Sequence, residues 1–225
     1  MMEPTAESMR KLYDKRFGAE LRARKESLWK VLCSDFFQKY VSETDTVIDL
    51  GAGYCEFINN IHCGRKFAVD LNEDTPQSAA ADVTVLLTEA DKMTQFEDNS
   101  VDVVFTSNLF EHIRSKDELL SILHEVHRVI KPGKRLLVMM PNIRYAYREY
   151  WDYYDHHLPL SHHSLSEVLT YTDFDVKEVR SRFLPYTFKT RLPQTDWLLR
   201  LYLRLRPAQL VFGRQMFVVA EKLSA

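Results

Sequence analysis

The sequence lacks any run of apolar residues near the ~18 that a membrane-spanning helix needs. Its first segment, MMEPTAESMRKLYDKRF, has no apolar core and therefore does not read as a secretory signal. Cysteine is scarce: Cys33, Cys55 and Cys63 are odd in number and have no paired metal spacing such as CxxC. Free thiols suit a reducing compartment, so we expect a soluble protein in the cytoplasm.

An excess of positive charge is also missing. Thirty Lys and Arg residues against 32 Asp and Glu give a net charge of -2, so no overall field attracts the chain to nucleic acid. We therefore expect no nucleic-acid partner. There is no internal repeat or low-complexity linker, and 225 residues with 45% hydrophobic content suit one globular domain.

The remaining pattern alternates between strands and helices. Residues 7–40 carry a charged helical periodicity, and Lys131-Pro132-Gly133 stops a later helix. Nearly all-apolar strands alternating with helices favour a parallel sheet covered on both faces. We predict an α/β, Rossmann-like fold with an N-terminal helical extension. The expected strands are 47–50, 66–71, 83–87, 101–106, 135–140, 176–183 and 215–221, and the expected helices are 56–61, 116–130 and 164–172.

The stretch VIDLGAGYCEF is the most informative part of the chain. A buried strand ending at Leu50 runs into Gly51, Ala52 and Gly53, a turn that lets the backbone pass close to a ligand. Asp70 ends the next strand, where an acidic side chain accepts the hydroxyls of a nucleotide ribose. The two features, in this order, predict a nucleoside-cofactor site.

Five motifs in sequence order resemble the class I S-adenosylmethionine-dependent methyltransferases, of the small-molecule type 11 or 23 kind. They are DLGAG (49–53), AVDLN (68–72), EAD (89–91), VDVVFTSNLFEHI (101–113) and LHEVHRVIKPGKRLLVMMPN (123–142). The resemblance implies S-adenosylmethionine as the cofactor and a seven-stranded sheet in which only the last strand is antiparallel. The segment from Tyr150 to Phe183 is similar to members whose genes accompany glycan or natural-product pathways.

The resemblance also divides the single domain, 1–225, into three parts and assigns cofactor contacts. Residues 1–42 form a helical cap, 43–142 the cofactor-binding core, and 143–225 the acceptor-site cap with the C-terminal strands. One departure is Cys55, which stands where the family has a third loop glycine. The implied cofactor residues are Asp49, Gly51, Ala52 and Gly53 for the methionine part, Asp70 for the ribose, Leu71, Ala90 and Asp91 for the adenine, and Asn108 between donor and acceptor.

Simpler interpretations stand beside these assignments. The glycines serve turns in any α/β protein, and Asp70 or Asp91 can be a solvated carboxylate at a strand end or in a loop. His112, in the FEHI segment, is a candidate general base or a buried histidine with a local hydrogen bond, and Glu111 is open in the same way.

A second cluster, YREYWDYYDHHLPLSHHS at 147–164, combines aromatic residues with four histidines. We expect it to cover the cofactor, and at least one of His156, His157, His162 and His163 to face its sulfur as a base. The predicted catalytic residues are His156, His157 and His112. Adjacent histidines rarely point the same way and no acidic ligand spacing is evident, so no metal site is predicted. The aromatic side chains either stack on a ring of the acceptor or form a core face.

A third feature, RLPQTDWLLRLYLRLRP at 191–207, alternates leucine with arginine. Peripheral membrane contact through 196–206 is one interpretation. Arg200 and Arg204 share a helical face that Arg206 does not join, so a helix packed on the sheet or at a homodimer interface is the other.

The predicted activity is transfer of the sulfonium methyl group to an oxygen or nitrogen nucleophile of a small molecule, with a sugar or a glycan or natural-product intermediate as first candidate. The alternatives are methylation of RNA or protein, and a regulatory subunit that binds S-adenosylmethionine without catalysis. Positioning donor and acceptor in line contributes ~7–11 kcal/mol in well-oriented reactions. Removing the acceptor's proton adds a factor of about 10²–10⁴.

Overall fold

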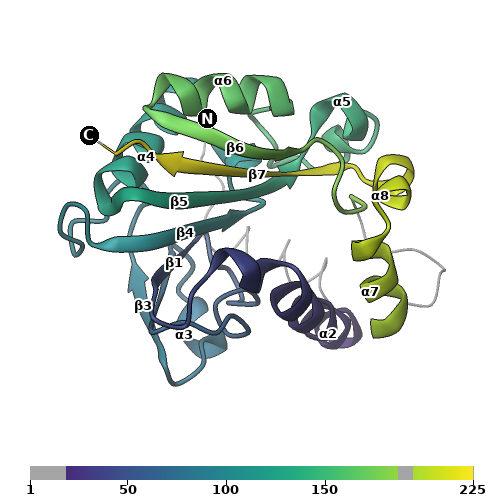
Figure 1. The fold of residues 1–225 in the computed structure, drawn as a ribbon, viewed down its shortest axis with the longest axis horizontal. Coiled ribbons are helices and arrows are strands. Elements are labelled where there is room, and N and C mark those ends of the chain that lie inside the picture. The colour runs from purple at the N-terminus through teal and green to yellow at the C-terminus, as the bar shows by residue number, and fades with distance from the viewer. Residues whose placement is uncertain (1–18, 187–194, 225) are drawn as a thin grey trace.

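The computed structural model describes residues 19–186 and 195–224. Seven strands form one sheet in the order β3-β2-β1-β4-β5-β7-β6 (Figure 1). The strands are β1 (Thr46–Leu50), β2 (Arg65–Asp70), β3 (Val83–Leu87), β4 (Val101–Ser107), β5 (Ile130–Pro141), β6 (Phe174–Arg180) and β7 (Gln215–Lys222).

Strand direction confirms the predicted sheet. β1 pairs in parallel with β2 on one side and β4 on the other, while β7 is antiparallel to both β5 and β6. The carboxyl ends of β1, β2, β3 and β4 therefore lie at one edge of the sheet. The loops that leave this edge are the place where ligands bind in open α/β sheets.

Helices cover both faces. α4 and α6 lie on one face, and α2 and α7 lie on the other (Figure 1). The α-helices are α2 (Ala19–Asp35), α3 (Thr75–Ser78), α4 (Lys116–Val129), α5 (Ile143–Ala146), α6 (His162–Tyr171), α7 (Asp196–Arg204) and α8 (Arg206–Phe212), and the 3-10 helices are η1 (Phe37–Tyr40), η2 (Phe110–His112) and η3 (Tyr150–Asp152).

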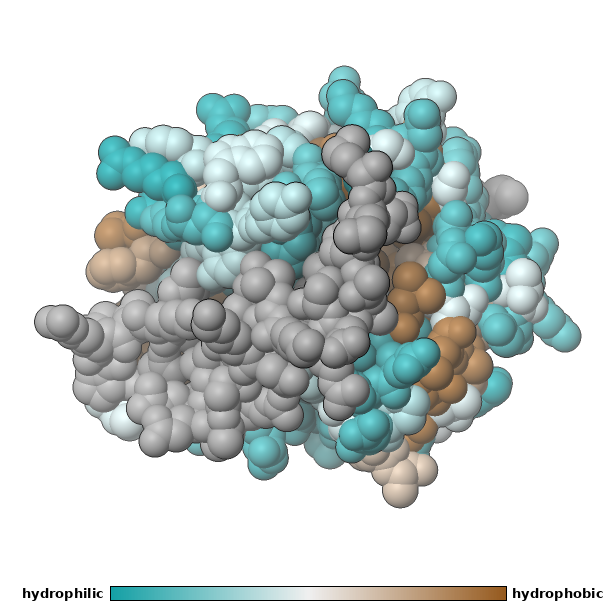
Figure 2. Space-filling view, turned by 180° about the vertical axis from the view of Figure 1, so that it is seen from behind, coloured by the Kyte–Doolittle hydropathy of each residue, from teal (hydrophilic) through white to brown (hydrophobic). Residues whose placement is uncertain are grey.

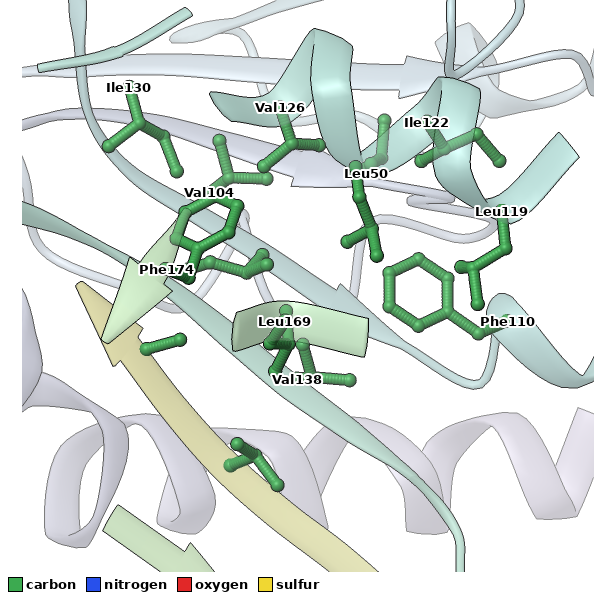
Figure 3. Packing of buried hydrophobic residues seen from close by; sticks show 14 of the residues in the cluster. Leu50, Val104, Phe110, Leu119, Ile122, Val126, Ile130, Val138, Leu169 and Phe174 are labelled. Atoms are coloured by element: carbon green, nitrogen blue, oxygen red, sulfur yellow. The ribbon is translucent and has the colours of Figure 1, made fainter. Parts of the chain in front are cut away.

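α4 shows why its sequence is helical. Ser115 caps its N-terminus by accepting a hydrogen bond from the Glu118 amide, and the apolar residues recur at helical spacing. Its side chains Leu119, Ile122 and Val126 point at the sheet and pack with Leu50, Val104 and Phe110 (Figure 3). Phe110 belongs to η2, so this packing fixes the turn that follows β4.

The opposite face is held by aromatic packing. Phe57 stacks on Phe105 with ring centroids 3.8 Å apart, and Trp29 and Phe37 of the N-terminal helical part meet the same rings edge-on. The helical extension predicted for 7–40 is thus present as α2 and η1, and residues 1–18 lie outside the described residues.

Three predicted elements differ in the structure. The strand expected at 135–140 already begins at Ile130 and runs to Pro141. Residues 56–61 form consecutive turns and not a helix, because the left-handed Cys55 and the bond from the Ile58 amide to the Asp49 carboxylate interrupt regular bonding. The strand expected at 176–183 begins two residues earlier, at Phe174, and ends three residues earlier, at Arg180. Beyond it the Phe183 amide still donates to the Gln215 carbonyl, which holds the chain beside β7 without a regular ladder.

Surface hydrophobic side chains gather in two places. Figure 2 shows one patch over α8, where Leu210, Val211 and Phe212 are exposed, and another over the edge strand β3, where Leu87 is exposed. Among the described residues, no helix combines the length and the apolar character needed to cross a membrane.

Candidate active site

The glycine loop that follows β1, Gly51 to Gly53, is hydrogen-bonded to the C-terminal end of β2. The amides of Gly51 and Ala52 donate to the Val69 carbonyl at 2.8 and 3.3 Å, and Gly51 and Gly53 have φ angles of 72° and 52°. A Cβ built at Gly53 meets no atom of the described part of the chain within 4 Å. The loop therefore presents open backbone at this point, as a closely approaching ligand requires.

Asp70, at the end of β2, is half-buried and holds this loop. Its Oδ2 accepts from the Gly53 amide at 2.6 Å, and its Oδ1 accepts from the Asn72 amide at 2.8 Å. The Thr75 hydroxyl adds a bond to the Gly53 carbonyl at 2.9 Å. Each carboxylate oxygen keeps lone-pair capacity for one further donor, which matches the two hydroxyls of a ribose.

The expected adenine residues lie on neighbouring loops. Asp70 is in register with Leu87, so the turns after β2 and β3 lie side by side. Leu71 follows β2 with 67% of its surface exposed, Ala90 packs on the core, and Asp91 is half-buried beside it. An exposed leucine and a carboxylate at this edge fit the face and the amine of an adenine.

Asp49 is buried within the sheet and has a structural contact. Its Oδ2 accepts from the Ile58 amide at 3.3 Å, and burial raises the pKa of this carboxyl well above its usual range. The residue therefore anchors the turns that follow the glycine loop, which keeps the open backbone at Gly53 in place.

Asn108 starts the turn after β4. It has a left-handed φ of 54°, a conformation that asparagine tolerates better than most residues, and its amide donates to the Met139 carbonyl. Its side-chain amide bonds the Ser107 hydroxyl at 3.0 Å. The reversal at Asn108 turns the chain into η2 at the same edge as the glycine loop.

Glu111 of η2 is almost fully buried, with 1% of its surface exposed, and its Oε2 has no hydrogen-bond partner among the described residues. Burial raises the pKa of this carboxyl to about 8. Its carbonyl accepts from the His157 and Leu158 amides at 2.7 and 3.2 Å. The segment after η3 is thereby fixed against η2.

Two histidines complete this group. The His112 Nδ1 lies 2.9 Å from the Asp155 carbonyl and 3.4 Å from the Asp155 carboxylate, and the rings of His112 and His156 meet edge to face at 4.9 Å. One side-chain donor atom from each of Glu111, His112 and His156 lies within 4.8 Å of the other two. The Tyr150 and Tyr153 rings pack against His156.

The other cap histidines lie apart from this group. The His157 side chain is exposed, and the His162 Nδ1 bonds the Asn142 side-chain amide at 3.0 Å while its ring packs on His163. Of the predicted catalytic residues, the structure brings His112 and His156 together and leaves His157 outside. Its role, like those of the other predicted site residues, stays a prediction.

Glu111 and Asp155 are not among the site residues that the sequence pattern predicts. The available signal was the position of Glu111 next to His112, in the turn after β4. The burial of Glu111 indicates a functional role, because a buried carboxylate oxygen without a hydrogen-bond partner is rare in proteins without such a role.

The helix expected at 196–206 packs against the body of the protein. The Arg200 guanidinium pairs with the Asp35 carboxylate at 2.6 Å, the Tyr202 hydroxyl donates to the Phe183 carbonyl at 2.7 Å, and Leu203 is buried. Trp197 and Leu201 remain exposed. The interpretation as a helix packed on the core is confirmed for this face.

Residues 48–138 match the family model of a methyltransferase domain, whereas no curated protein matches the chain. Among solved structures, the chain is similar to a SAM-dependent methyltransferase from Archaeoglobus fulgidus at 21% identity and TM-score 0.69, over 94% of this chain and 98% of that chain. It is also similar to a Haloferax volcanii complex of the Trm112 methyltransferase activator and a putative methyltransferase, at 19% identity and TM-score 0.67 over all of both chains.

A third similar structure is the geranyl diphosphate C-methyltransferase from Streptomyces coelicolor in complex with Mg²⁺, geranyl diphosphate and S-adenosyl-L-homocysteine. It is 15% identical with TM-score 0.64, and the match covers 94% of this chain and 84% of that chain. At these identities the three structures establish a shared fold.

A Rossmann-like sheet with a glycine loop after β1 and a carboxylate after β2 defines a protein that binds a nucleoside cofactor. The matching domain model then specifies the chemistry. Residues 48–138 of the chain are a methyltransferase domain. The protein is an enzyme whose cofactor is S-adenosylmethionine and which acts on an acceptor substrate.

Proposed function

We propose that the enzyme methylates an oxygen or nitrogen nucleophile of a small molecule, with a sugar or a glycan or natural-product intermediate as the first acceptor to test. The observation that carries this proposal is the group Glu111–His112–His156, in which Glu111 and His156 are buried and His112 is half-buried. The group lies after Asn108 at the carboxyl edge of the sheet. Tyr150 and Tyr153 enclose it on the cap side. A polar group enclosed by aromatic rings suits a small polar acceptor.

The cofactor's positively charged sulfur supplies an activated methyl group. We assign the methionine part to Gly51, Ala52 and Gly53, with Asp49 supporting the loop. The ribose is assigned to Asp70, the adenine to Leu71, Ala90 and Asp91, and the junction with the acceptor to Asn108. The fit rests on the open backbone at Gly53 and on the fixed Asp70 carboxylate.

The chain's own task is to align the acceptor and to draw its proton away. The acceptor's lone pair forms the new bond to the methyl carbon, and the electrons of the broken carbon–sulfur bond stay on sulfur. The released proton leaves at the Glu111–His112–His156 group, with His156 as the first candidate residue and His112 beside it. We place the three parts 1–42, 43–142 and 143–225 as helical cap, cofactor core and acceptor cap.

Other acceptors and partners remain alternatives. The enzyme could instead methylate RNA or protein, or the chain could be a subunit that binds the cofactor without catalysis. These alternatives are distinguished by which acceptor, if any, becomes methylated. The similar Haloferax volcanii protein is held in a complex with an activator, so an activating partner is one further arrangement to test. A homodimer or peripheral membrane contact through 196–206 is proposed only for the exposed side of α7.

The test incubates the protein with S-adenosylmethionine and panels of hydroxylated, amine-bearing, RNA and protein acceptors, and follows S-adenosylhomocysteine release. We expect turnover with a small-molecule panel. His156→Ala should lower kcat by about 10²-fold or more while cofactor affinity stays unchanged. His163→Ala is the matched control and should keep near-normal turnover. Methylation confined to RNA or protein, or no turnover despite tight cofactor binding, would replace the proposal with the corresponding alternative.

A further inference from the structure

We propose that Glu111, His112 and His156 bind one divalent transition-metal ion, with Zn²⁺ as the first candidate. The proposal rests on the proposed function for the acceptor site, and it replaces the direct imidazole base proposed there with a metal ion. It also departs from the expectation that this chain has no metal site. That expectation came from the adjacent histidines at 156–157 and 162–163. In the structure only one residue of the first pair, His156, lies beside Glu111 and His112 of η2.

The donor set has the composition of an open catalytic site. One carboxylate and two imidazoles hold zinc in a common class of enzymes and leave the fourth position for water or substrate. The donor atoms lie within 4.8 Å of one another. Tetrahedral bonds of ~2.0–2.2 Å would bring ligand atoms to about 3.4 Å, so small side-chain adjustments close the site.

The burial of Glu111 supplies an independent reason for a cation. Its Oε2 is enclosed by protein and has no hydrogen-bond partner within 19–186 and 195–224. A buried carboxylate in this condition is costly unless it is paired or coordinates a metal. The residue stands on a short 3-10 turn that begins the acceptor side of the active site, so an ion that satisfies it lies where the acceptor enters.

The surroundings orient the two imidazoles. The His112 Nδ1 faces the Asp155 carbonyl and carboxylate, so we expect an ion to bind this histidine through its Nε2. The two amides that follow His156 donate to the Glu111 carbonyl, so the backbone carrying one ligand is bound to the backbone carrying another. Carbonyl or carboxylate partners behind histidine ligands are a regular feature of metal sites.

At this position the ion binds the acceptor's hydroxyl oxygen. It lowers the pKa of that hydroxyl, and the proton passes to solvent because the imidazole lone pairs are engaged by the metal. The oxygen's lone pair then forms the bond to the methyl carbon while the carbon–sulfur electrons remain on sulfur. If an imidazole acted directly as the base, turnover would not depend on a metal ion. Methyl transfer by chelator-treated protein therefore distinguishes the two mechanisms.

The experiment titrates full-length, chelator-treated protein with Co²⁺, whose visible absorption reports nitrogen and oxygen coordination, and then displaces it with Zn²⁺. We expect one equivalent to bind, and Glu111→Gln, His112→Ala and His156→Ala each to weaken binding at least 10-fold. His157→Ala is the matched control, because the His157 side chain is exposed and only its backbone contacts Glu111. Thermal unfolding of each variant separates lost ligation from lost folding.

No saturable binding, or equal affinity in all four variants, would overturn the metal site. The proposed function is judged separately by methyl transfer in the chelator-treated protein. Undiminished turnover without metal would contradict the proposed metal ion and would still support the small-molecule methyltransferase. Specific Co²⁺ binding together with methylation of RNA or protein alone would support the proposed metal site and contradict the proposed small-molecule acceptor.

Discussion

Asp70 holds the glycine loop and is also the residue that we propose binds the ribose. Because its Oδ2 accepts from the Gly53 amide at 2.6 Å, its removal takes away both a ligand contact and a support of the loop. We expect Asp70→Ala to weaken S-adenosylmethionine binding by about 1–3 kcal/mol in calorimetry. Asp82→Asn is the control, since this exposed residue pairs with Lys66 outside the site. Equal affinities for Asp70→Ala and the native protein would show that Asp70 does not bind the cofactor.

Cys55 shows how a departure from a motif is accommodated. It keeps a left-handed φ of 61°, which favours glycine, and its side chain is fully buried near the Thr75 carbonyl. Its burial raises the pKa of the thiol to about 12, while the pKa of the half-buried Cys63 rises to about 11. A thiol reacts as the thiolate, so both resist alkylation near neutral pH.

We therefore expect iodoacetamide at pH 8 to label the native protein slowly, with Cys63 first and Cys33 and Cys55 last, because the latter two are buried. Mass spectrometry of time points measures the order. The same reaction in guanidinium chloride is the control and should label all three thiols. Rapid labelling of Cys55 in the folded protein would contradict its enclosed position.

At the scale of elements, the two loop glycines serve different purposes. A Cβ at Gly51 would lie 3.0 Å from the Leu109 side chain, whereas a Cβ at Gly53 meets no atom of the described residues within 4 Å. Each Gly→Ala change adds about 1–2 kcal/mol of left-handed strain. We expect Gly51→Ala to lower the free energy of unfolding more, and Gly53→Ala to impair cofactor binding more. Denaturant unfolding measures the stability of the two variants, and calorimetry measures their affinity for the cofactor. The reverse result would contradict the proposed position of the cofactor at Gly53.

The periodic elements of the fold were predictable from the sequence, and the site was predictable only in part. The apolar strands and the capped helix α4 carry their own signals, as the alternation of 101–106 and 116–130 illustrates. Residues 56–61 do not, since their turn structure depends on contacts with Asp49 from another element. The meeting of Glu111 with His156 depends likewise on how a distant segment folds back, which periodicity does not encode.

At the scale of the whole molecule, binding of the cofactor adds to folding stability. A ligand present at 100 times its dissociation constant stabilises the native state by about 2.7 kcal/mol. We expect thermal unfolding to shift upward with S-adenosylmethionine or S-adenosylhomocysteine and to stay unchanged with NAD or ATP. A shift produced by NAD alone would conflict with the cofactor identified from the methyltransferase domain.

The order of the strands has a consequence for synthesis of the protein. β7 lies between β5 and β6 although it follows both in the chain. When a ribosome has released residues 174–180, β6 still has no strand with which to pair. The sheet beyond β5 therefore closes only after residues 215–222 emerge, and until then the edge of β5 is exposed to chaperones and to other nascent chains.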